Sequence, residues 1–196
     1  MNRAVFLDRD GVINELVYYE EQGIIDSPFA VEQFSLFPWT GEAIKKLSEA
    51  DYKVVVVSNQ PGIAKGQLSR ETFDDIRQKM REELAGQGAY VDGEYYCFHH
   101  PEGRVEGLKM NCECRKPKPG LLLQAAREHD IDLSRSWMVG DGLTDVRAGK
   151  SAGCKTMLVG KMKCQLCRLM DEEDAHPDAI VSSLLEAVSI VLDSEG

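Results

Sequence analysis

The sequence has no apolar run long enough to cross a membrane, and no signal peptide precedes its first predicted strand. It also has no internal repeat, no low-complexity tract and no linker rich in proline, glycine or serine. We therefore expect a cytoplasmic protein with no membrane partner, folded as a single domain over residues 1–196. A monomer is the expected oligomeric state.

Positive charge is also scarce. The chain carries 33 acidic residues against 23 lysines and arginines, which gives a net charge of −10. This balance argues against nucleic acid as a partner. A small anionic substrate remains compatible, because a metal and a few cations can reverse the charge locally. Six cysteines without a signal peptide indicate metal ligands or free thiols rather than a disulfide framework.

Short β-branched or apolar runs alternate with segments of helical periodicity, with Thr40 and Ser69 as expected N-caps of the first two helices. Strands are predicted at residues 4–7, 53–57, 93–98, 136–140 and 154–159, and helices at residues 39–50, 69–84, 119–129, 146–152 and 179–192. The alternation predicts an α/β protein with a parallel sheet and helices on both faces. The intervals between motifs leave no room for a separate cap domain.

The first predicted strand ends in Asp8-Arg9-Asp10-Gly11. Unpaired carboxylates next to a buried strand are costly, and the carboxyl end of a parallel strand is where open α/β sheets place their sites. Residues two apart point the same way in a strand, so Asp8 and Asp10 can face one focus before Gly11 turns the chain. A polar turn or a calcium loop is the alternative interpretation of this short pattern.

Polar residues also follow two other predicted strands and precede one helix: Ser58, Asn59, Asp141, Asp145 and Lys116. Each has an ordinary explanation by itself, such as a turn, a helix cap or a solvated lysine. Because parallel strands end at one edge of a sheet, however, we expect these groups to converge there. Carboxylates, a hydroxyl and a lysine form a set suited to phosphoryl transfer.

The chemistry of these side chains suggests a role for each. Asp8 is ionised at neutral pH and can attack phosphorus without a base. Mg²⁺, held by Asp8, Asp141 and a backbone oxygen, with Asp10 as the third residue of the metal set, would remove the repulsion from the phosphate. Asp10 would protonate the leaving group and then deprotonate water. Ser58 and Lys116 would hold the phosphoryl oxygens.

With these motifs in place, the sequence resembles the haloacid dehalogenase superfamily of phosphotransferases over nearly its whole length. Phe6-Leu-Asp-Arg-Asp-Gly11 matches the first motif, Val57-Ser-Asn59 the second, Lys116 the third and Gly140-Asp-x-x-x-Asp145 the fourth. The resemblance implies a Rossmann-like fold and a Mg²⁺-dependent aspartyl-phosphate mechanism. It also implies that Asp141 is a metal ligand that Asp145 supports.

Residues 97–114 carry Cys97-Phe-His99-His100 and Cys112-Glu-Cys114. Two short ligand pairs in a segment without an apolar stripe suit a structural Zn²⁺, with reduced thiols and surface histidines as the alternative. Spacing alone leaves the choice of histidine open. The segment resembles the branch of the superfamily that acts on heptose bisphosphate and histidinol phosphate. That resemblance implies Cys97, His99, Cys112 and Cys114 as zinc ligands and Arg115 as a substrate contact.

The resemblance also suggests the substrate, a phosphorylated sugar. Residues 60–66 look more like the heptose enzymes, and the chain ends without the dehydratase domain often fused to histidinol phosphatases. We expect hydrolysis of the 7-phosphate of D-glycero-D-manno-heptose 1,7-bisphosphate. Tyr19, Asn59, Gln60, Pro61 and Arg115 are the expected substrate contacts. A histidinol-phosphate phosphatase and a zinc-dependent interaction protein without turnover are the alternatives; a nucleic-acid 3′-phosphatase is disfavoured by the acidic balance.

Two residues depart from the branch: Gly142 stands where heptose enzymes often have lysine, and Pro61 where serine is common. Cys164 and Cys167 form a Cys-x-x-Cys pair with no counterpart there, compatible with two thiols, a reversible disulfide or a metal half-site. Cys154 is expected to be a small buried apolar side chain.

Overall fold

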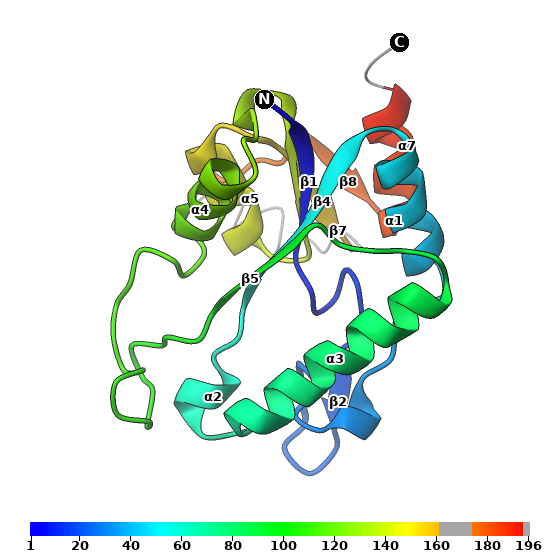
Figure 1. The fold of residues 1–196 in the computed structure, drawn as a ribbon. Coiled ribbons are helices and arrows are strands. Elements are labelled where there is room, and N and C mark those ends of the chain that lie inside the picture. The colour runs from blue at the N-terminus through cyan, green and yellow to red at the C-terminus, as the bar shows by residue number, and fades with distance from the viewer. Residues whose placement is uncertain (161–173, 194–196) are drawn as a thin grey trace.

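The computed structural model describes residues 1–160 and 174–193. Its centre is a six-stranded sheet in the order β5-β4-β1-β6-β7-β8, in which every pairing is parallel (Figure 1). The strands are β1 (Arg3–Leu7), β4 (Tyr52–Asn59), β5 (Gly93–Cys97), β6 (Trp137–Gly140), β7 (Lys155–Val159) and β8 (Ala179–Val181). The predicted fold class is confirmed.

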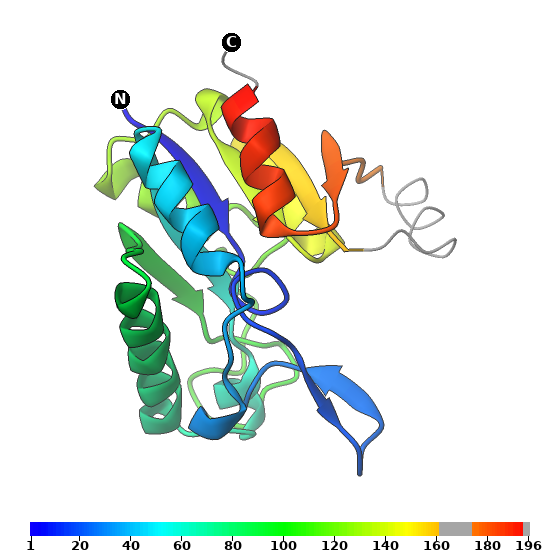
Figure 2. The same ribbon diagram turned by 90° about the vertical axis from the view of Figure 1, so that its right-hand side faces the viewer.

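Helices cover both faces of this sheet (Figures 1 and 2). They are α1 (Thr40–Glu49), α2 (Gly62–Lys65), α3 (Arg70–Gly86), α4 (Gly120–Glu128), α5 (Leu143–Ala152) and α7 (Leu184–Asp193), with 3-10 turns η1 (Val31–Gln33) and η2 (Leu133–Arg135). Buried residues of α1, α3 and α7 share one apolar cluster, and those of α4 and α5 share the other. No helix in the described part of the chain combines the length and apolar character that a membrane span needs.

The central strand β1 is buried on both sides, which explains its continuous apolar sequence. Val5 and Leu7 face the cluster under α1 and α7, whereas Ala4 and Phe6 face the cluster under α4. β1 lies between β4 and β6, so its carboxyl end is flanked by theirs. This placement brings the polar strand ends together at one edge of the sheet.

The sequence predicted an N-cap residue for α1 and another for α3, and only the prediction for α3 is correct. Ser69 accepts a hydrogen bond from the Thr72 backbone N–H at 2.9 Å and caps α3, as expected. Thr40 is not the N-cap of α1: Trp39 occupies that position without a side-chain cap. The Thr40 hydroxyl instead donates to the Ile13 carbonyl at 2.8 Å and ties α1 to the segment after the first motif.

The prediction of a helix from residue 179 is wrong at its start. Ala179–Val181 forms β8, which pairs with β7, and helix α7 begins at Leu184. The edge of the sheet offers backbone partners to this short β-branched run. The Ser183 hydroxyl accepts from the Glu186 N–H at 3.2 Å, and Glu186 accepts from the Ser182 N–H at 2.8 Å, so polar side chains mark the true helix start.

The segment from residue 15 to 37, predicted as a loop, contains a small antiparallel hairpin of β2 (Val17–Tyr19) and β3 (Ile24–Asp26). The hairpin projects from the body of the protein in Figure 2, and Tyr18 and Ile25 are exposed on it. Strands of three residues in an acid-rich segment leave too little alternation for sequence reasoning to detect. The pair Cys164 and Cys167 lies outside the described residues.

Candidate active site

Three carboxylates meet at the carboxyl edge of the sheet. Asp8 follows β1 and is held there because its N–H donates to the Val139 carbonyl of β6 at 2.9 Å. Asp141 and Asp145 follow β6, and each of the three residues offers a carboxylate oxygen within 4.8 Å of the others. The structure thus brings together residues that lie more than 130 positions apart in the sequence.

Lys116 completes this cluster from the other side. Its side chain is almost fully buried, and its Nζ lies 2.6 Å from Asp145 Oδ1 and 3.0 Å from Asp8 Oδ2. It also donates to the Val57 carbonyl at 2.8 Å. Burial by itself would lower the pKa of Lys116, but the carboxylates of Asp145 and Asp8 outweigh it and raise the pKa above its ordinary value. The ammonium group therefore stays charged.

Asn59 fixes the backbone of Lys116. Its Oδ1 accepts from the Lys116 N–H and its Nδ2 donates to the Lys116 carbonyl, both at 3.0 Å. Asn59 was predicted to contact substrate, but both polar atoms of its side chain bind the backbone of Lys116. Asn59 also lies opposite Cys97 in the pairing of β4 with β5, so it connects the catalytic edge to the cysteine cluster.

The crowding of carboxylates at this edge raises the pKa values of two of them. Asp141 is exposed, yet desolvation by the surrounding protein, with Asp8 and Asp145 nearby, raises its pKa to about 7. Burial raises the pKa of Asp145, the Lys116 ammonium opposes that shift and Asp8 adds to it. Oxygen ligands whose mutual repulsion one dication would relieve fit a hard metal such as Mg²⁺.

Asp145 also caps a helix, which is the ordinary role that its sequence position suggested. Its Oδ2 accepts from the Gly142 N–H at 3.0 Å and so caps the first turn of α5. Close approach of β6 is required for this arrangement, because a Cβ added at Gly140 would lie 2.2 Å from the Asp145 side chain. One carboxylate therefore both begins the helix and binds the buried lysine.

The Asp10 carboxylate does not belong to the cluster of Asp8, Asp141 and Asp145, although we expected it to lie beside Asp8. Its carboxylate accepts from Arg9 Nη2 at 3.1 Å, Asn14 Nδ2 at 3.0 Å and Gln60 Nε2 at 2.7 Å. Burial would raise the pKa of Asp10, but the Arg9 guanidinium and the bonds from Asn14 and Gln60 together lower it. Arg9 is fully buried and was not singled out from the sequence; its position between two motif aspartates was the available signal.

Gln60 links Asp10 to the predicted phosphate-binding serine. It is 3% exposed, and its Nε2 also lies 3.2 Å from Ser58 Oγ, while its Oε1 accepts from Arg9 Nη2 at 3.0 Å. All of its polar atoms are engaged with protein groups. Gln60 was predicted as a substrate contact, and in this structure its side chain contacts Arg9, Asp10 and Ser58.

The four predicted zinc ligands form one compact group. Cys114 Sγ lies 3.2 Å from Cys97 Sγ, 3.3 Å from Cys112 Sγ and 3.4 Å from His99 Nδ1. Ligands on one tetrahedral zinc with bonds of about 2.3 Å lie about 3.8 Å apart, close to this spacing. His100 is outside the group, and its Nδ1 accepts from the Glu102 N–H at 3.1 Å. Tertiary structure thus separates the two histidines.

Comparison with known proteins shows which family the chain belongs to. A family model described as "HAD-hyrolase-like", the haloacid dehalogenase-like hydrolases, matches residues 113–187. A protein of Pasteurella multocida (strain Pm70) named D-glycero-beta-D-manno-heptose-1,7-bisphosphate 7-phosphatase is 42% identical over 161 residues, 82% of this chain and 83% of that protein. One of the same name from Haemophilus ducreyi is 38% identical and covers 96% of this chain and 98% of its own length.

The chain belongs to the haloacid dehalogenase-like hydrolases. It is a phosphoric monoester hydrolase, as the resemblance of its motifs predicted. A crystal structure of D,D-heptose 1.7-bisphosphate phosphatase from B. bronchiseptica, complexed with magnesium and phosphate, has a TM-score of 0.78 and 31% sequence identity. The match covers 98% of this chain and 99% of that one. A Mesorhizobium loti protein described as a HAD-like phosphatase gives a TM-score of 0.79 with 32% identity.

Tyr19, Pro61 and Arg115 are the three other predicted substrate contacts of this hydrolase. The Tyr19 hydroxyl donates to the Ser27 carbonyl at 2.9 Å, and its ring stacks on Phe29 within the hairpin region. Pro61 is half-buried at the start of α2. Arg115 is half-buried, with Nη1 3.4 Å from the His99 carbonyl oxygen.

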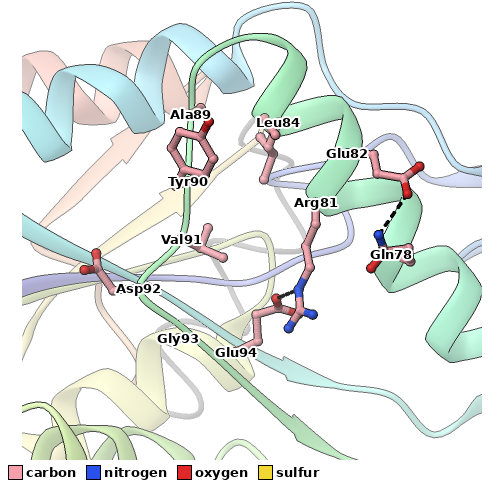
Figure 3. A pocket seen from close by; sticks show the side chains of 11 residues that line it. Gln78, Arg81, Glu82, Leu84, Ala89, Tyr90, Val91, Asp92, Gly93 and Glu94 are labelled. Atoms are coloured by element: carbon pink, nitrogen blue, oxygen red, sulfur yellow. Dashed lines mark hydrogen bonds and ion pairs between the residues drawn. The ribbon is translucent and has the colours of Figure 1, made fainter.

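A separate hollow of about 440 Å³ lies between α3 and β5 (Figure 3). Two pairs of its polar side chains bind each other: Arg81 pairs with Glu94, and Gln78 donates to Glu82. None of the residues of the carboxylate or cysteine clusters lines it. The candidate active site of the hydrolase is therefore the carboxyl edge of the sheet and not this hollow.

A substitution at Gly11 tests whether the carboxyl edge of the sheet is the active site. It has φ +81°, and an added Cβ would lie 2.2 Å from Asp141 Oδ2. We expect Gly11→Ala to push Asp141 out of the carboxylate cluster and to lower kcat/KM for p-nitrophenyl phosphate by about 100-fold, the usual effect of misplacing a reacting group by about 1 Å. Gly88→Ala, at φ +70° with open space around it, is the matched control. It should lose only about 1–2 kcal/mol of folding free energy and keep its activity. Equal activity of the two variants would contradict this role of the edge.

Proposed function

We propose that this hydrolase removes the 7-phosphate of D-glycero-D-manno-heptose 1,7-bisphosphate through an aspartyl-phosphate on Asp8. The observation that carries the proposal is the buried Lys116 paired with Asp8 and Asp145 beside Asp141, in a chain 37–42% identical to proteins named for that reaction. A buried ion pair contributes little net stability to a fold, so a lysine buried among three carboxylates is better explained by catalysis than by a structural or binding role.

In the first half of the reaction, Asp8 attacks phosphorus as its ionised carboxylate. The P–O bond to the sugar breaks as the new bond to Asp8 forms, and the leaving oxygen receives a proton from Asp10. Lys116, which pairs with Asp8, and the buried Ser58 hydroxyl, which contacts Asp10 through Gln60, hold the phosphoryl oxygens. A Mg²⁺ bound by Asp8 and Asp141 would neutralise the repulsion between the carboxylate and the phosphate dianion.

In the second half, water attacks the phosphorus of the aspartyl-phosphate and Asp10 takes its proton. The Arg9, Asn14 and Gln60 contacts lower the pKa of Asp10 and so keep its carboxylate ionised, the form that can accept a proton. They also aim the carboxylate, since three side chains fix its two oxygens. Because those oxygens are engaged, a contribution of Asp10 to the metal site would come from its backbone carbonyl.

The cysteine cluster is proposed as a structural Zn²⁺ site formed by Cys97, His99, Cys112 and Cys114. It immediately precedes Arg115 and Lys116, so a metal there would fix the backbone that places both cations. All four positions of a tetrahedron are filled by protein atoms, which leaves no open position for chemistry. The cytoplasmic location and the monomeric state stay predictions.

The nucleophile is tested by Asp8→Asn. The amide cannot form the phosphoenzyme, so hydrolysis of p-nitrophenyl phosphate in Mg²⁺ should fall at least 1,000-fold while the circular dichroism spectrum is kept. Asp10→Asn, the comparison variant, should lose more activity on sugar phosphates than on p-nitrophenyl phosphate, whose leaving group needs no proton. Near-normal turnover by Asp8→Asn would exclude the aspartyl-phosphate mechanism.

The zinc proposal predicts one tightly held Zn²⁺ per chain after purification without chelator. Cys112→Ser should lower the zinc content and reduce kcat/KM, because the backbone before Arg115 and Lys116 is loosened. Cys154→Ser, which removes a buried thiol outside the cluster, should leave the zinc content unchanged. Elemental analysis showing no zinc in the unmodified protein would overturn the assignment.

The substrate is tested by comparing heptose bisphosphate with histidinol phosphate. We expect kcat/KM to favour the bisphosphate by about two orders of magnitude, roughly 3 kcal/mol of transition-state binding. Arg115→Ala should lower this preference about tenfold with less effect on p-nitrophenyl phosphate, since a guanidinium binds an anion or hydroxyls in a fork. Equal or better efficiency on histidinol phosphate would favour that phosphatase instead.

A further inference from the structure

Gln60 is held by its backbone and by both polar atoms of its side chain. Its backbone N–H donates to the Cys97 carbonyl at 2.7 Å, which ties the residue to the end of β5. The side chain is 3% exposed, although the residue directly follows β4 at the carboxyl edge of the sheet. A buried amide whose polar atoms are all engaged has a fixed orientation, because turning it over would break its hydrogen bonds.

The partners of this amide show which way it points. Its Oε1 accepts from Arg9 Nη2 at 3.0 Å, and the Arg9 Cζ lies 5.4 Å from the centre of the Phe73 ring. Its Nε2 donates to Asp10 Oδ2 at 2.7 Å and to Ser58 Oγ at 3.2 Å. A guanidinium only donates and an ionised carboxylate only accepts, so the amide oxygen must face Arg9 and its nitrogen must face Asp10. The two hydrogens on Nε2 are therefore both used, one for each acceptor.

The hydrogen bond from Gln60 limits where the Ser58 hydroxyl can point. A serine oxygen carries one hydrogen and two lone pairs, and here one lone pair accepts from Gln60. The hydroxyl hydrogen must then point away from the amide, and within residues 1–160 and 174–193 it is donated to no other protein group. A hydroxyl held in this state is an available donor for a phosphoryl oxygen.

We propose that Gln60 is a positioning residue, which holds Asp10 and Ser58 in one frame and turns the Ser58 hydroxyl hydrogen toward the transferred phosphoryl group. This inference rests on the proposed function, in which Asp10 moves protons and Ser58 holds a phosphoryl oxygen. It gives Gln60 a role in both halves of the reaction without any contact with the sugar. The sequence had indicated a substrate contact at this position instead.

The experiment replaces Gln60 with methionine, which has a similar length but makes none of these hydrogen bonds. The substrate is p-nitrophenyl phosphate, which carries no sugar that a substrate contact could bind. Hydrolysis of the aspartyl-phosphate needs Asp10 whatever the leaving group was, so kcat should fall roughly 30-fold, a part of the usual effect of general acid–base catalysis, with KM within about threefold. Gln78→Met, which removes the bond of an exposed glutamine to Glu82, is the matched control and should keep kcat within about twofold.

A second variant and a double variant show how Gln60 acts. Gln60→Glu keeps an oxygen that can accept from Arg9. Its carboxylate cannot donate to Asp10 or Ser58, so kcat should fall at least as far as in Gln60→Met while the circular dichroism spectrum is kept. In an Asp10→Asn background, Gln60→Met should cost only about threefold, because a residue that acts through another adds little once the other is changed.

Two outcomes would overturn this role of Gln60 alone. One is an unchanged kcat for p-nitrophenyl phosphate in both Gln60 variants with a raised KM for sugar phosphates, which is the behaviour of a substrate contact. The other is an equal loss of kcat with Asp10 present or replaced, which is the behaviour of a structural residue. Near-normal turnover by Asp10→Asn itself would instead refute the proposed mechanism, and this inference with it.

Discussion

A buried ammonium group is the constraint on which the rest of this structure depends. Lys116 lies under the carboxyl edge of the sheet, and removing its charge from water would cost several kcal/mol without partners. Asp8 after β1, Asp145 in the first turn of α5 and the Val57 carbonyl of β4 supply those partners. The charge therefore requires the ends of β1 and β6 to lie beside β4, and it holds the Asp8 carboxylate in place.

A second buried ion pair lies beside the first and is kept separate from it. Arg9 and Asp10 bind each other and exclude Asp10 from the carboxylate cluster, while Gln60 connects Asp10 to Ser58. The division suits the proposed mechanism, in which Asp8 forms the phosphoenzyme and Asp10 moves protons, because these two roles need different environments. Arg9 therefore sets the position of Asp10, and Asp145 sets that of Lys116.

Sequence reasoning succeeded where local pattern and long-range structure agree. The buried run of β1, the Ser69 cap and the α3 stripe of Phe73, Ile76, Met80 and Leu84 were predicted, and all four stripe residues are buried. It failed where a tertiary partner competes with local preference. Residues 179–181 pair with the sheet edge instead of joining a helix, and Thr40 bonds to Ile13 instead of capping α1.

The sequence alone determined the order of the motifs and hence the fold class and the family. Its resemblance to the family also implied His99 as the histidine of the cysteine cluster, a choice that spacing alone left open. Only the tertiary structure decided which carboxylates meet, with Asp145 rather than Asp10 joining Asp8 and Asp141, and that Gln60 is buried. Spacing along a strand or loop limits which side a residue can face. The direction of a charged side chain is fixed by the partner that offsets its desolvation, and those partners come from distant parts of the chain.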